Sequence, residues 1–416
     1  MSRTFVRVAA LAAAALAATS LTACKSASST GSGDSGTITI GASIPLSGAL
    51  ASFGSFEKWG YQHAVDEVNA KGGLKVGSSK RKVKLILLDD KTDPNVTVNN
   101  VTKLITESHV DAVLGSCTDS LVEPGALIAN RNKVPMVTSC AATNTFGSTA
   151  KWTYAWDLFF NSEQLTETPF NTVDELGLKT NKKVAIIHSN GPNETVIGAQ
   201  EWPKWAKKHG WTVTYNTALA PDSTQFTSAV AQAKQSGADM LLAVFPPPAA
   251  IALRKQLKAA NYNPKLLSIE EGGEPQAFSD ALGALANGIM VGGYWDPSFP
   301  YPGASQIRTD FESQTHQTFS QHIADTYTAA KILLDAIGRA GSVDKAKVNE
   351  QIGKTDATYV VGPIKFGADH TSTLPMVETQ WQAGKVVVIA PKDRANAKVI
   401  FPLPGNGRGK IVKGTA

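Results

Sequence analysis

The chain has 416 residues, of which 42% are hydrophobic, with 40 Lys and Arg against 35 Asp and Glu. This length allows a large buried core and favours two lobes over one. The small positive excess excludes the strongly basic surface typical of nucleic-acid-binding proteins. After the first 23 residues, no segment is long and apolar enough to cross a membrane.

The first residues have the order of a bacterial secretion signal. Arg3 and Arg7 precede an Ala- and Leu-rich run that is too short for a membrane anchor. Cys24 follows Leu21-Thr22-Ala23, which resembles the lipobox of bacterial lipoproteins. We therefore expect residues 1–23 to be removed and Cys24 to carry a lipid, so that the protein is held at the cell membrane outside the cytoplasm. The alternative is an ordinary secretion signal with an incidental cysteine.

Beyond the signal, residues 24–36 are rich in Ser and Gly and predict a flexible tether. Alternating apolar residues then predict a strand at 37–42. Ser47, Gly48 and Phe53 lie in an open loop after it, and helical spacing begins at Phe56. In an open α/β sheet, the loop beyond a strand's carboxyl end is where ligands bind. This loop is therefore a candidate binding element.

Strand and helix patterns alternate along the next segments, which predicts parallel strands with crossover helices. Asp93-Pro94 has the form of a helix start, with Asp at the N-cap. An extended aromatic segment, KWTYAWDLFFN, interrupts the series at 151–161, and a second series follows. The expected strands are 83–88, 111–114, 134–138, 183–187, 213–215, 240–245, 266–269 and 289–294, and the expected helices are 96–107, 121–130, 195–209, 226–235, 249–260, 305–314, 323–339 and 345–352. A hairpin is expected at 377–389.

Several runs together resemble the type I periplasmic binding proteins, and most closely the leucine/isoleucine/valine-binding receptors of ABC importers. These runs are GASIPLSG, AVDEVNAKGG, LLDDKTDP, VTKLITESHVDAVLGS, VPMVTSCAATN, KKVAIIHSN, LLSIEEGG and VVGPIKF. The resemblance implies an α/β fold of two doubly wound, Rossmann-like lobes joined by three hinge crossings. It places the crossings at 157–161, 294–297 and 363–367. The expected N-terminal lobe is 37–158 plus 296–362, the C-terminal lobe is 159–295 plus 363–401, and 402–416 is a loose tail.

The resemblance also implies residues of a ligand site in the first lobe. Receptors of this family hold the ligand's carboxylate at helix starts, where unpaired N–H groups and the helix dipole favour an anion. The matching residues are Thr118, Ser120, Ala141, Ala142 and Thr143. Plain helix N-capping by Ser and Thr is the other interpretation. Asp119 departs from the serine-rich family pattern and would repel an anionic ligand unless its side chain points away.

In the second lobe, the resemblance gives Glu271 the role of binding the ligand's ammonium, although Glu270-Glu271 also fits a solvated turn. Phe53 and Phe245 match positions of aromatic contact with the ligand. Core packing is the alternative for both, and it is the stronger interpretation for Phe245, which ends a buried strand. Asn193 stands where the family usually has Tyr, and this difference puts the identity of the ligand in doubt.

Cys117 and Cys140 follow strands predicted to be neighbours. Outside the cytoplasm, two such cysteines are candidates for a disulfide; two free buried thiols are the alternative. The His residues have no metal-binding spacing, and no nucleophile–base set is found, so we expect neither a metal, nor a cofactor, nor catalysis.

The resulting hypothesis is a monomeric, extracytoplasmic solute-binding lipoprotein of an ABC importer that delivers a small amino acid, most simply a branched-chain one, to a permease and its ATPase subunits. An amide, urea-like or aromatic acid ligand is the alternative within this class. A ligand-sensing receptor domain is the alternative outside it, and would usually need a membrane span and signalling domain after the last residue.

Overall fold

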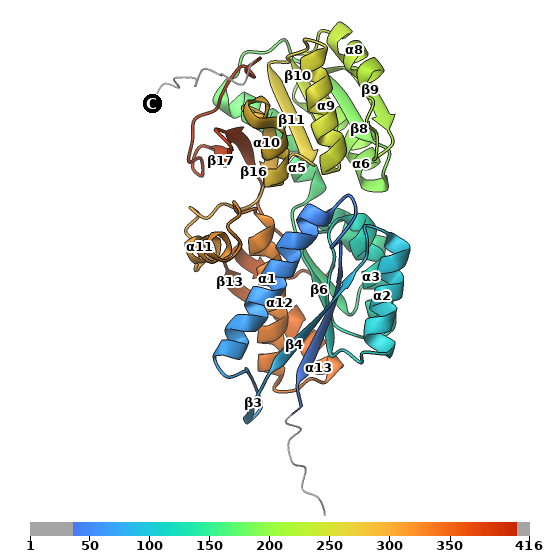
Figure 1. Ribbon diagram of the computed structural model, residues 1–416, viewed down its shortest axis with the longest axis vertical. Coiled ribbons are helices and arrows are strands. Elements are labelled where there is room, and N and C mark those ends of the chain that lie inside the picture. The colour runs from blue at the N-terminus through green and yellow to red at the C-terminus, as the bar shows by residue number, and fades with distance from the viewer. Residues whose placement is uncertain (1–35, 406–416) are drawn as a thin grey trace, which may run out of the picture. The chain divides into compact units, whose positions relative to one another are not determined.

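The computed structural model describes residues 36–405, so the expected signal, Cys24 and almost all of the tether lie outside the described residues. It has two main sheets, and each is covered by helices (Figure 1). The predicted α/β fold with two doubly wound lobes is confirmed. Within the described residues, no helix is both long and apolar enough to cross a membrane.

The first lobe is built on six parallel strands in the order β15-β7-β6-β5-β1-β4. Its helix α1 packs against α12, and α2 packs against α3. Gly60 permits the first contact, because a Cβ at this position would lie 2.2 Å from Thr326 Oγ1. The bounds are β1 (Ile38–Ile44), α1 (Ala51–Ala70), β4 (Val83–Asp89), α2 (Pro94–Thr106), β5 (Ala112–Leu114), α3 (Asp119–Arg131), β6 (Met136–Thr138), α4 (Thr143–Thr149), β7 (Ala155–Phe159), α11 (Ala304–Thr315), α12 (His322–Ala340), α13 (Lys345–Gly353) and β15 (Thr371–Thr373).

The second lobe is built on seven strands in the order β17-β16-β12-β11-β10-β8-β9. Five are parallel, and β16 and β17 form the predicted antiparallel hairpin. The bounds are α5 (Ser162–Leu176), β8 (Lys183–Ser189), α6 (Pro192–Val196), a π-helical turn (Ile197–Glu201), α7 (Trp202–Lys208), β9 (Thr212–Leu219), α8 (Thr227–Gln235), β10 (Met240–Phe245), α9 (Pro247–Ala259), β11 (Leu266–Glu271), α10 (Gln276–Leu282), a 3-10 turn (Gly283–Ala286), β12 (Met290–Gly293), β16 (Val377–Gln382) and β17 (Lys385–Ala390). Two small hairpins, β2 (Leu74–Val76) with β3 (Ser79–Arg81) and β13 (Asp356–Tyr359) with β14 (Gly362–Lys365), complete the structure.

Local sequence signals explain how several elements begin. Asp93 caps α2, since its side chain accepts a hydrogen bond from the Asn95 N–H, as the sequence predicts. Asn161 does the same for α5 through the Glu163 N–H, although this helix is absent from the elements that we predicted. The five parallel strands of the second sheet include β10, which is buried at every position. Such runs are typical of strands covered on both faces.

The chain passes between the two sheets three times. The first passage follows β7 and the second follows β12, close to the expected positions. The third was expected at 363–367, and this expectation is wrong. Strand β15 still pairs with β7 in the first sheet, so the chain crosses after Thr373 and before β16. Strand β15 has only three residues, which are too few for an alternating pattern to predict a strand.

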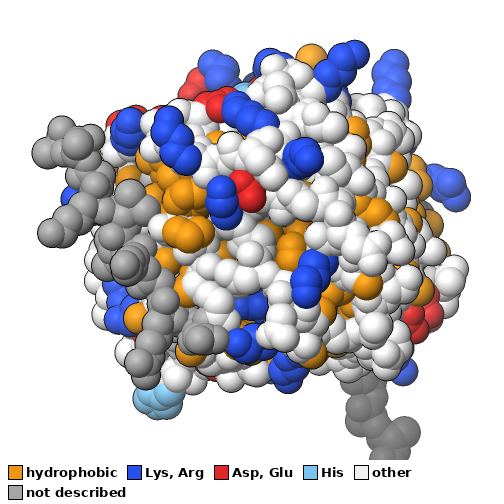
Figure 2. All heavy atoms as spheres, turned by 90° about the horizontal axis from the view of Figure 1, so that it is seen from above, with side chains coloured by type: hydrophobic (Ala, Val, Ile, Leu, Met, Phe, Trp, Pro, Cys, Tyr) orange, Lys and Arg blue, Asp and Glu red, His pale blue; other side chains and the backbone are white. Residues whose placement is uncertain are grey.

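The loose tail was predicted to begin at residue 402, and this boundary is too early. Leu403 is buried in the second core, and its N–H donates to the Lys265 carbonyl at 2.7 Å. Leu403 and Pro404 are therefore buried in the fold, while 406–416 lie outside the described part. On the face of the molecule seen from above, basic side chains stand singly among uncharged and hydrophobic atoms, as Figure 2 shows. This face carries no continuous basic stripe.

Candidate functional site

Two loops of the first lobe carry five of the predicted site residues. They follow β5 and β6, which are parallel neighbours, so both loops leave the same edge of the sheet. Thr118 has a positive φ of 67°, and its Oγ1 lies 3.0 Å from Ser120 Oγ. Neither α3 nor α4 has a side-chain N-cap. The capping interpretation of these hydroxyl groups therefore has no hydrogen bond to support it.

The second of these loops is buried and internally bonded. Ala141, Ala142 and Thr143 are all at most 2% exposed. Thr143 Oγ1 lies 2.9 Å from Thr373 Oγ1 and donates to the Phe160 carbonyl at 3.3 Å. This hydroxyl thus ties the start of α4 to the first and third passages between the sheets.

The Asp119 side chain accepts a hydrogen bond from a backbone N–H group of this loop. Its Oδ1 accepts the hydrogen bond from the Ala142 N–H at 3.0 Å. Burial, and after it the negative charge of Glu123, raise the pKa of Asp119 to about 7, against the hydrogen bond from Ala142. The side chain therefore points into the loop and presents a carboxyl group where the family resemblance implied free donors.

Three glutamates of the second lobe gather near the end of β11. Glu271 is the last residue of this strand and has a positive φ of 61°. Gly272 follows, and its N–H donates to the Phe245 carbonyl at 2.8 Å. A Cβ on Gly272 would lie 2.4 Å from that oxygen, so the close approach requires glycine. The turn places Glu271 beside Glu194.

The charges of these groups interact strongly. Burial raises the pKa of Glu271 well above its usual value, and Glu194, the Cys117 thiol and Glu274 raise it further. Glu194 also raises the pKa of Asp119 in the first lobe. Carboxyl groups that interact in this way do not all ionise together. The arrangement is an electronegative site to which both lobes contribute.

Glu274 makes the direct link between the lobes. Its Oε2 accepts a hydrogen bond from Gln321 Nε2 at 2.8 Å and lies 3.0 Å from His322 Nε2. His322 is buried, and Asp325 and Glu274 raise its pKa although burial opposes this. A charged imidazole here would compensate part of the carboxylate excess.

The two predicted aromatic residues have different positions. Phe53 is 2% exposed and packs edge-on against the His322 ring, with 5.0 Å between centroids. It lies in the first core beside the acidic site. Phe245 is fully buried in the second core and packs perpendicular to Phe226. Phe53 and Phe245 thus belong to different hydrophobic cores, one in each lobe.

Asn193 lies in α6, directly after β8. Its Oδ1 is shielded from solvent and has no hydrogen-bond partner among the described residues. A buried amide oxygen without a partner is unusual and is a ready acceptor for a ligand donor. Its neighbour Glu194 belongs to the acidic site, so Asn193 lies next to that site in the chain.

The cysteine prediction is wrong in one respect. Cys117 and Cys140 lie close together, as expected for residues after neighbouring strands, but both are free thiols and 3% exposed. Burial, and after it the Cys117 thiol, raise the pKa of Cys140 well above its usual value. The alternative of two buried thiols is the one that the structure shows.

Sequence reasoning did not find Glu57, Glu274, Tyr294, Gln321 or His322. Glu274 follows Glu271 by three residues across two glycines, which was the one available signal. Tyr294 Oη lies 3.0 Å from His322 Nδ1, but 28 residues separate the two in the chain. Such contacts between distant elements leave no local spacing to recognise.

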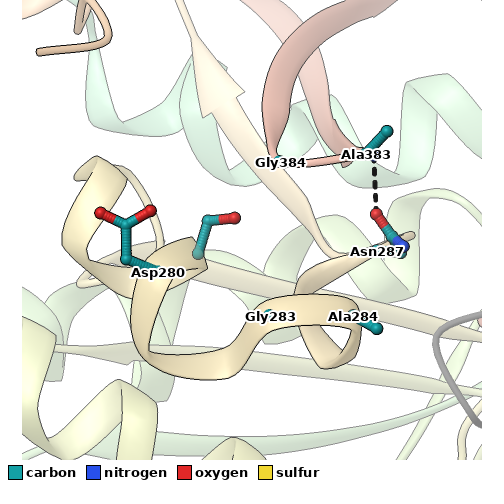
Figure 3. Close-up of a pocket in the computed structure, with 7 residues that line it drawn as sticks. Asp280, Gly283, Ala284, Asn287, Ala383 and Gly384 are labelled. Carbon is teal, nitrogen blue, oxygen red and sulfur yellow. Dashed lines mark hydrogen bonds between the residues drawn. The ribbon is translucent and has the colours of Figure 1, made fainter.

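Two surface hollows lie away from these residues. One, of about 400 Å³, is lined by residues of α10, the 3-10 turn and the β16–β17 hairpin, including Asp280 and Asn287 (Figure 3). There Asn287 Oδ1 accepts the Ala383 N–H at 2.7 Å. The other, of about 380 Å³, lies between α4 and the helices α5 to α7. Neither contains a predicted site residue.

The chain is similar to known proteins over most of its length. A family model described as periplasmic binding protein matches residues 37–385. The Leu/Ile/Val-binding protein homolog 8 of Brucella abortus is 25% identical over 388 residues, covering 88% of this chain and 93% of the relative.

Solved structures give the same result for the fold. A branched-chain amino acid substrate-binding protein of Streptococcus pneumoniae in complex with isoleucine has a TM-score of 0.76 at 22% identity, covering 85% of this chain and 100% of that one. A solute-binding protein from R. palustris in complex with benzoate has a TM-score of 0.72 at 18% identity, covering 87% and 100%.

Proposed function

Since the chain belongs to the periplasmic binding protein family, whose members are solute receptors and not enzymes, we propose that it captures a small ammonium-bearing solute between its lobes for an ABC importer. An amino acid is the simplest such solute, and a branched-chain amino acid is the first to test. The location is extracytoplasmic, as the family implies. Lipid attachment at Cys24 and delivery to a permease are parts of this proposal.

The observation that carries the proposal is the cluster of Glu194, Glu271 and Glu274. Burial, and after it Glu194 and Glu274, raise the pKa of Glu271, so its carboxyl group favours its proton when no cation is bound. A ligand ammonium in their midst would replace that proton and form charge-assisted hydrogen bonds. Two residues of the first lobe interact with these glutamates, since Cys117 raises the pKa of Glu271 and Glu194 raises the pKa of Asp119. Contacts with both lobes favour the closed form of a two-lobe receptor.

A second candidate within the same role follows from Asp119. Its carboxyl group takes the Ala142 N–H, one of the donors expected for a ligand carboxylate. This favours a ligand that has an ammonium or amide group but no carboxylate. The similar solved structures support different ligands. One is in complex with isoleucine, which has both an ammonium and a carboxylate, and another is in complex with benzoate, which has no ammonium.

A thermal-melting screen of the purified full-length protein tests the proposal. The panel contains the amino acids, isoleucine carboxamide, 3-methylpentanoate, benzoate and urea. A ligand at a hundred times its Kd stabilises the folded protein by about 2.7 kcal/mol. We expect a raised melting temperature with isoleucine, or with its carboxamide if the second candidate holds. A rise only with benzoate or 3-methylpentanoate would contradict an ammonium-binding site.

A further inference from the structure

A compact group of metal-ligating side chains lies inside the first lobe, next to the acidic site, and the proposed function gives no ligand contact to Cys140, Asp325 or Glu57. Its centre is Cys140, two residues after β6. The ligand atoms of Glu57, Cys117 and Cys140 lie within 4.8 Å of one another, and so do those of Cys140, His322 and Asp325. All five side chains are buried. We call these five residues the Cys140 cluster.

The distances within the cluster are those of a tetrahedral site. Cys140 Sγ lies 3.7 Å from His322 Nδ1 and 4.0 Å from Asp325 Oδ2, and the latter two atoms are 3.5 Å apart. Zinc bonds to sulfur, nitrogen and oxygen of about 2.0–2.3 Å place neighbouring tetrahedral ligands roughly 3.3–3.8 Å apart. The three atoms therefore lie close to the edges of one face of such a tetrahedron.

Several ligand atoms in the cluster lack another partner. Both carboxylate oxygens of Glu57 and Oδ1 of Asp325 are buried without a hydrogen bond among the described residues. Glu57 is 1% exposed and Asp325 fully buried. A buried carboxylate without a partner is costly unless a cation or a proton compensates it. His322 is one compensating cation, but its two ring nitrogens already approach Asp325 and Glu274.

The other ring nitrogen of His322, Nε2, has the carboxylate partner that is typical of a metal-bound histidine. This nitrogen lies 3.0 Å from Glu274 Oε2. A metal-bound histidine almost always gives its other N–H to a carboxylate or carbonyl, which fixes the ring and the tautomer. With Nε2–H donated to Glu274, an Nδ1 that gives up its proton to the incoming ion would direct its lone pair towards Cys140 and Asp325. Tyr294 Oη, 3.0 Å from Nδ1, would yield this position to the metal.

We propose that Cys140, His322 and Asp325 bind a thiophilic divalent metal ion, Zn²⁺ foremost, with Cys117 or Glu57 as the fourth ligand. The donor set explains the choice of metal, since thiolate with imidazole and one carboxylate suits Zn²⁺ and not Ca²⁺ or Mg²⁺. Each thiol that binds releases its proton to solvent, Nδ1 of a protonated His322 does the same, and no oxidation occurs. The ion would fix the His322 ring, and with it the contact to Glu274 of the second lobe.

The experiment uses purified, reduced full-length protein titrated with Co²⁺, which replaces Zn²⁺ in tetrahedral thiolate sites and makes the site visible. We expect one equivalent of Co²⁺ per chain to bind, with a thiolate-to-cobalt absorption band that Zn²⁺ abolishes. Cys140→Ser should lower the affinity at least a hundredfold and weaken the band. His316→Asn, which removes an exposed imidazole outside the cluster, should leave both unchanged.

Two results would overturn the proposal. One is a wild-type protein that melts cooperatively yet shows no cobalt–thiolate band. The other is a Cys140→Ser variant that binds Co²⁺ with the wild-type affinity and spectrum. If Cys140→Ser does not fold, Asp325→Asn takes its place, since it keeps the size of the side chain and removes one ligand charge. Its Co²⁺ affinity should fall at least tenfold, and an unchanged affinity counts against the proposal.

Discussion

Asp119 Oδ1 accepts a hydrogen bond from the Ala142 N–H at 3.0 Å, and this contact joins the two loops that the family resemblance assigned to a ligand carboxylate. A carboxyl group of the protein itself is thus placed where an anionic ligand group was expected. The contact has consequences for stability and for the choice of ligand, because the Asp119 side chain is only 8% exposed.

Replacement of Asp119 by Asn should stabilise the protein at high pH. Burial and Glu123 raise the pKa of Asp119 from 3.8 to about 7. The folded state therefore holds this proton more tightly than the unfolded state, so the free energy of unfolding falls as the pH rises from about 4 to about 7 and is flat above. Because a pKa difference of one corresponds to about 1.4 kcal/mol, Asp119→Asn should gain up to a few kcal/mol at about pH 8 and nothing near pH 4.

Urea unfolding at both pH values measures this effect. Asp222→Asn is the matched control, because it makes the same change in an exposed turn. It should not alter the pH dependence. A wild-type stability that rises between about pH 4 and about pH 7 in step with Asp119 ionisation would show that the carboxylate is stabilised by the fold.

Replacement of Glu271 by Gln should weaken binding of an ammonium-bearing ligand. Removing one charge of a buried ion pair typically costs about 2–5 kcal/mol, which is a loss of affinity of roughly thirtyfold or more. Glu270→Gln is the control, since Glu270 lies next in the chain but is held by Ser268 Oγ and the Gly292 N–H. Calorimetric titration should give the control an affinity within about twofold of wild type. Equal affinities for all three proteins would remove Glu271 from the site.

Ligand binding should depend on pH. The pKa of Glu271 is raised by burial and by Glu194, Cys117 and Glu274, so the free site holds a proton that an ammonium must displace. Affinity should therefore increase as the pH rises through this raised pKa and decrease as the pH falls. Titrations in buffers of different ionisation enthalpy should detect proton release on binding. Proton uptake on binding would indicate that the ligand presents an anion to these carboxyl groups.

Replacement of Phe245 by Leu separates a core role from a ligand role. The ring is fully buried against Phe226, so the change should lower the free energy of unfolding by about 1 kcal/mol and leave ligand affinity unchanged. Phe226→Leu, on the other side of this contact, should have a similar effect. Weakened binding at unchanged stability would instead assign Phe245 to the ligand.

Much of the fold was predictable from the sequence, for identifiable reasons. Strand β10 is a buried run with the predicted bounds, and Asp93-Pro94 begins α2 as expected. Periodic burial and capping are local signals and survive folding. Strand β15 was missed, because its three residues pair with β7 over a sequence distance of about two hundred. No local pattern records that pairing.

The site was less predictable than the fold. Glu271 could be located because it ends a recognisable strand, but its proximity to Glu194 depends on a positive φ and on Gly272. The Cys140 cluster is assembled from α1, the ends of β5 and β6, and α12. A search for metal-binding spacing finds nothing, because its ligands are far apart in the chain. Proximity of Cys117 and Cys140 was predicted, while the disulfide preferred for them was wrong and the alternative of two buried thiols was right.

The most direct test compares one ligand with and without its ammonium group. Isoleucine, its carboxamide and 3-methylpentanoate share the same side chain and differ only at the groups in question. Calorimetry of the full-length protein should show binding of isoleucine or its carboxamide at least about a hundredfold tighter than binding of 3-methylpentanoate, as for loss of a buried charge pair. Equal or tighter binding of 3-methylpentanoate would contradict the claim that Glu194, Glu271 and Glu274 form an ammonium site.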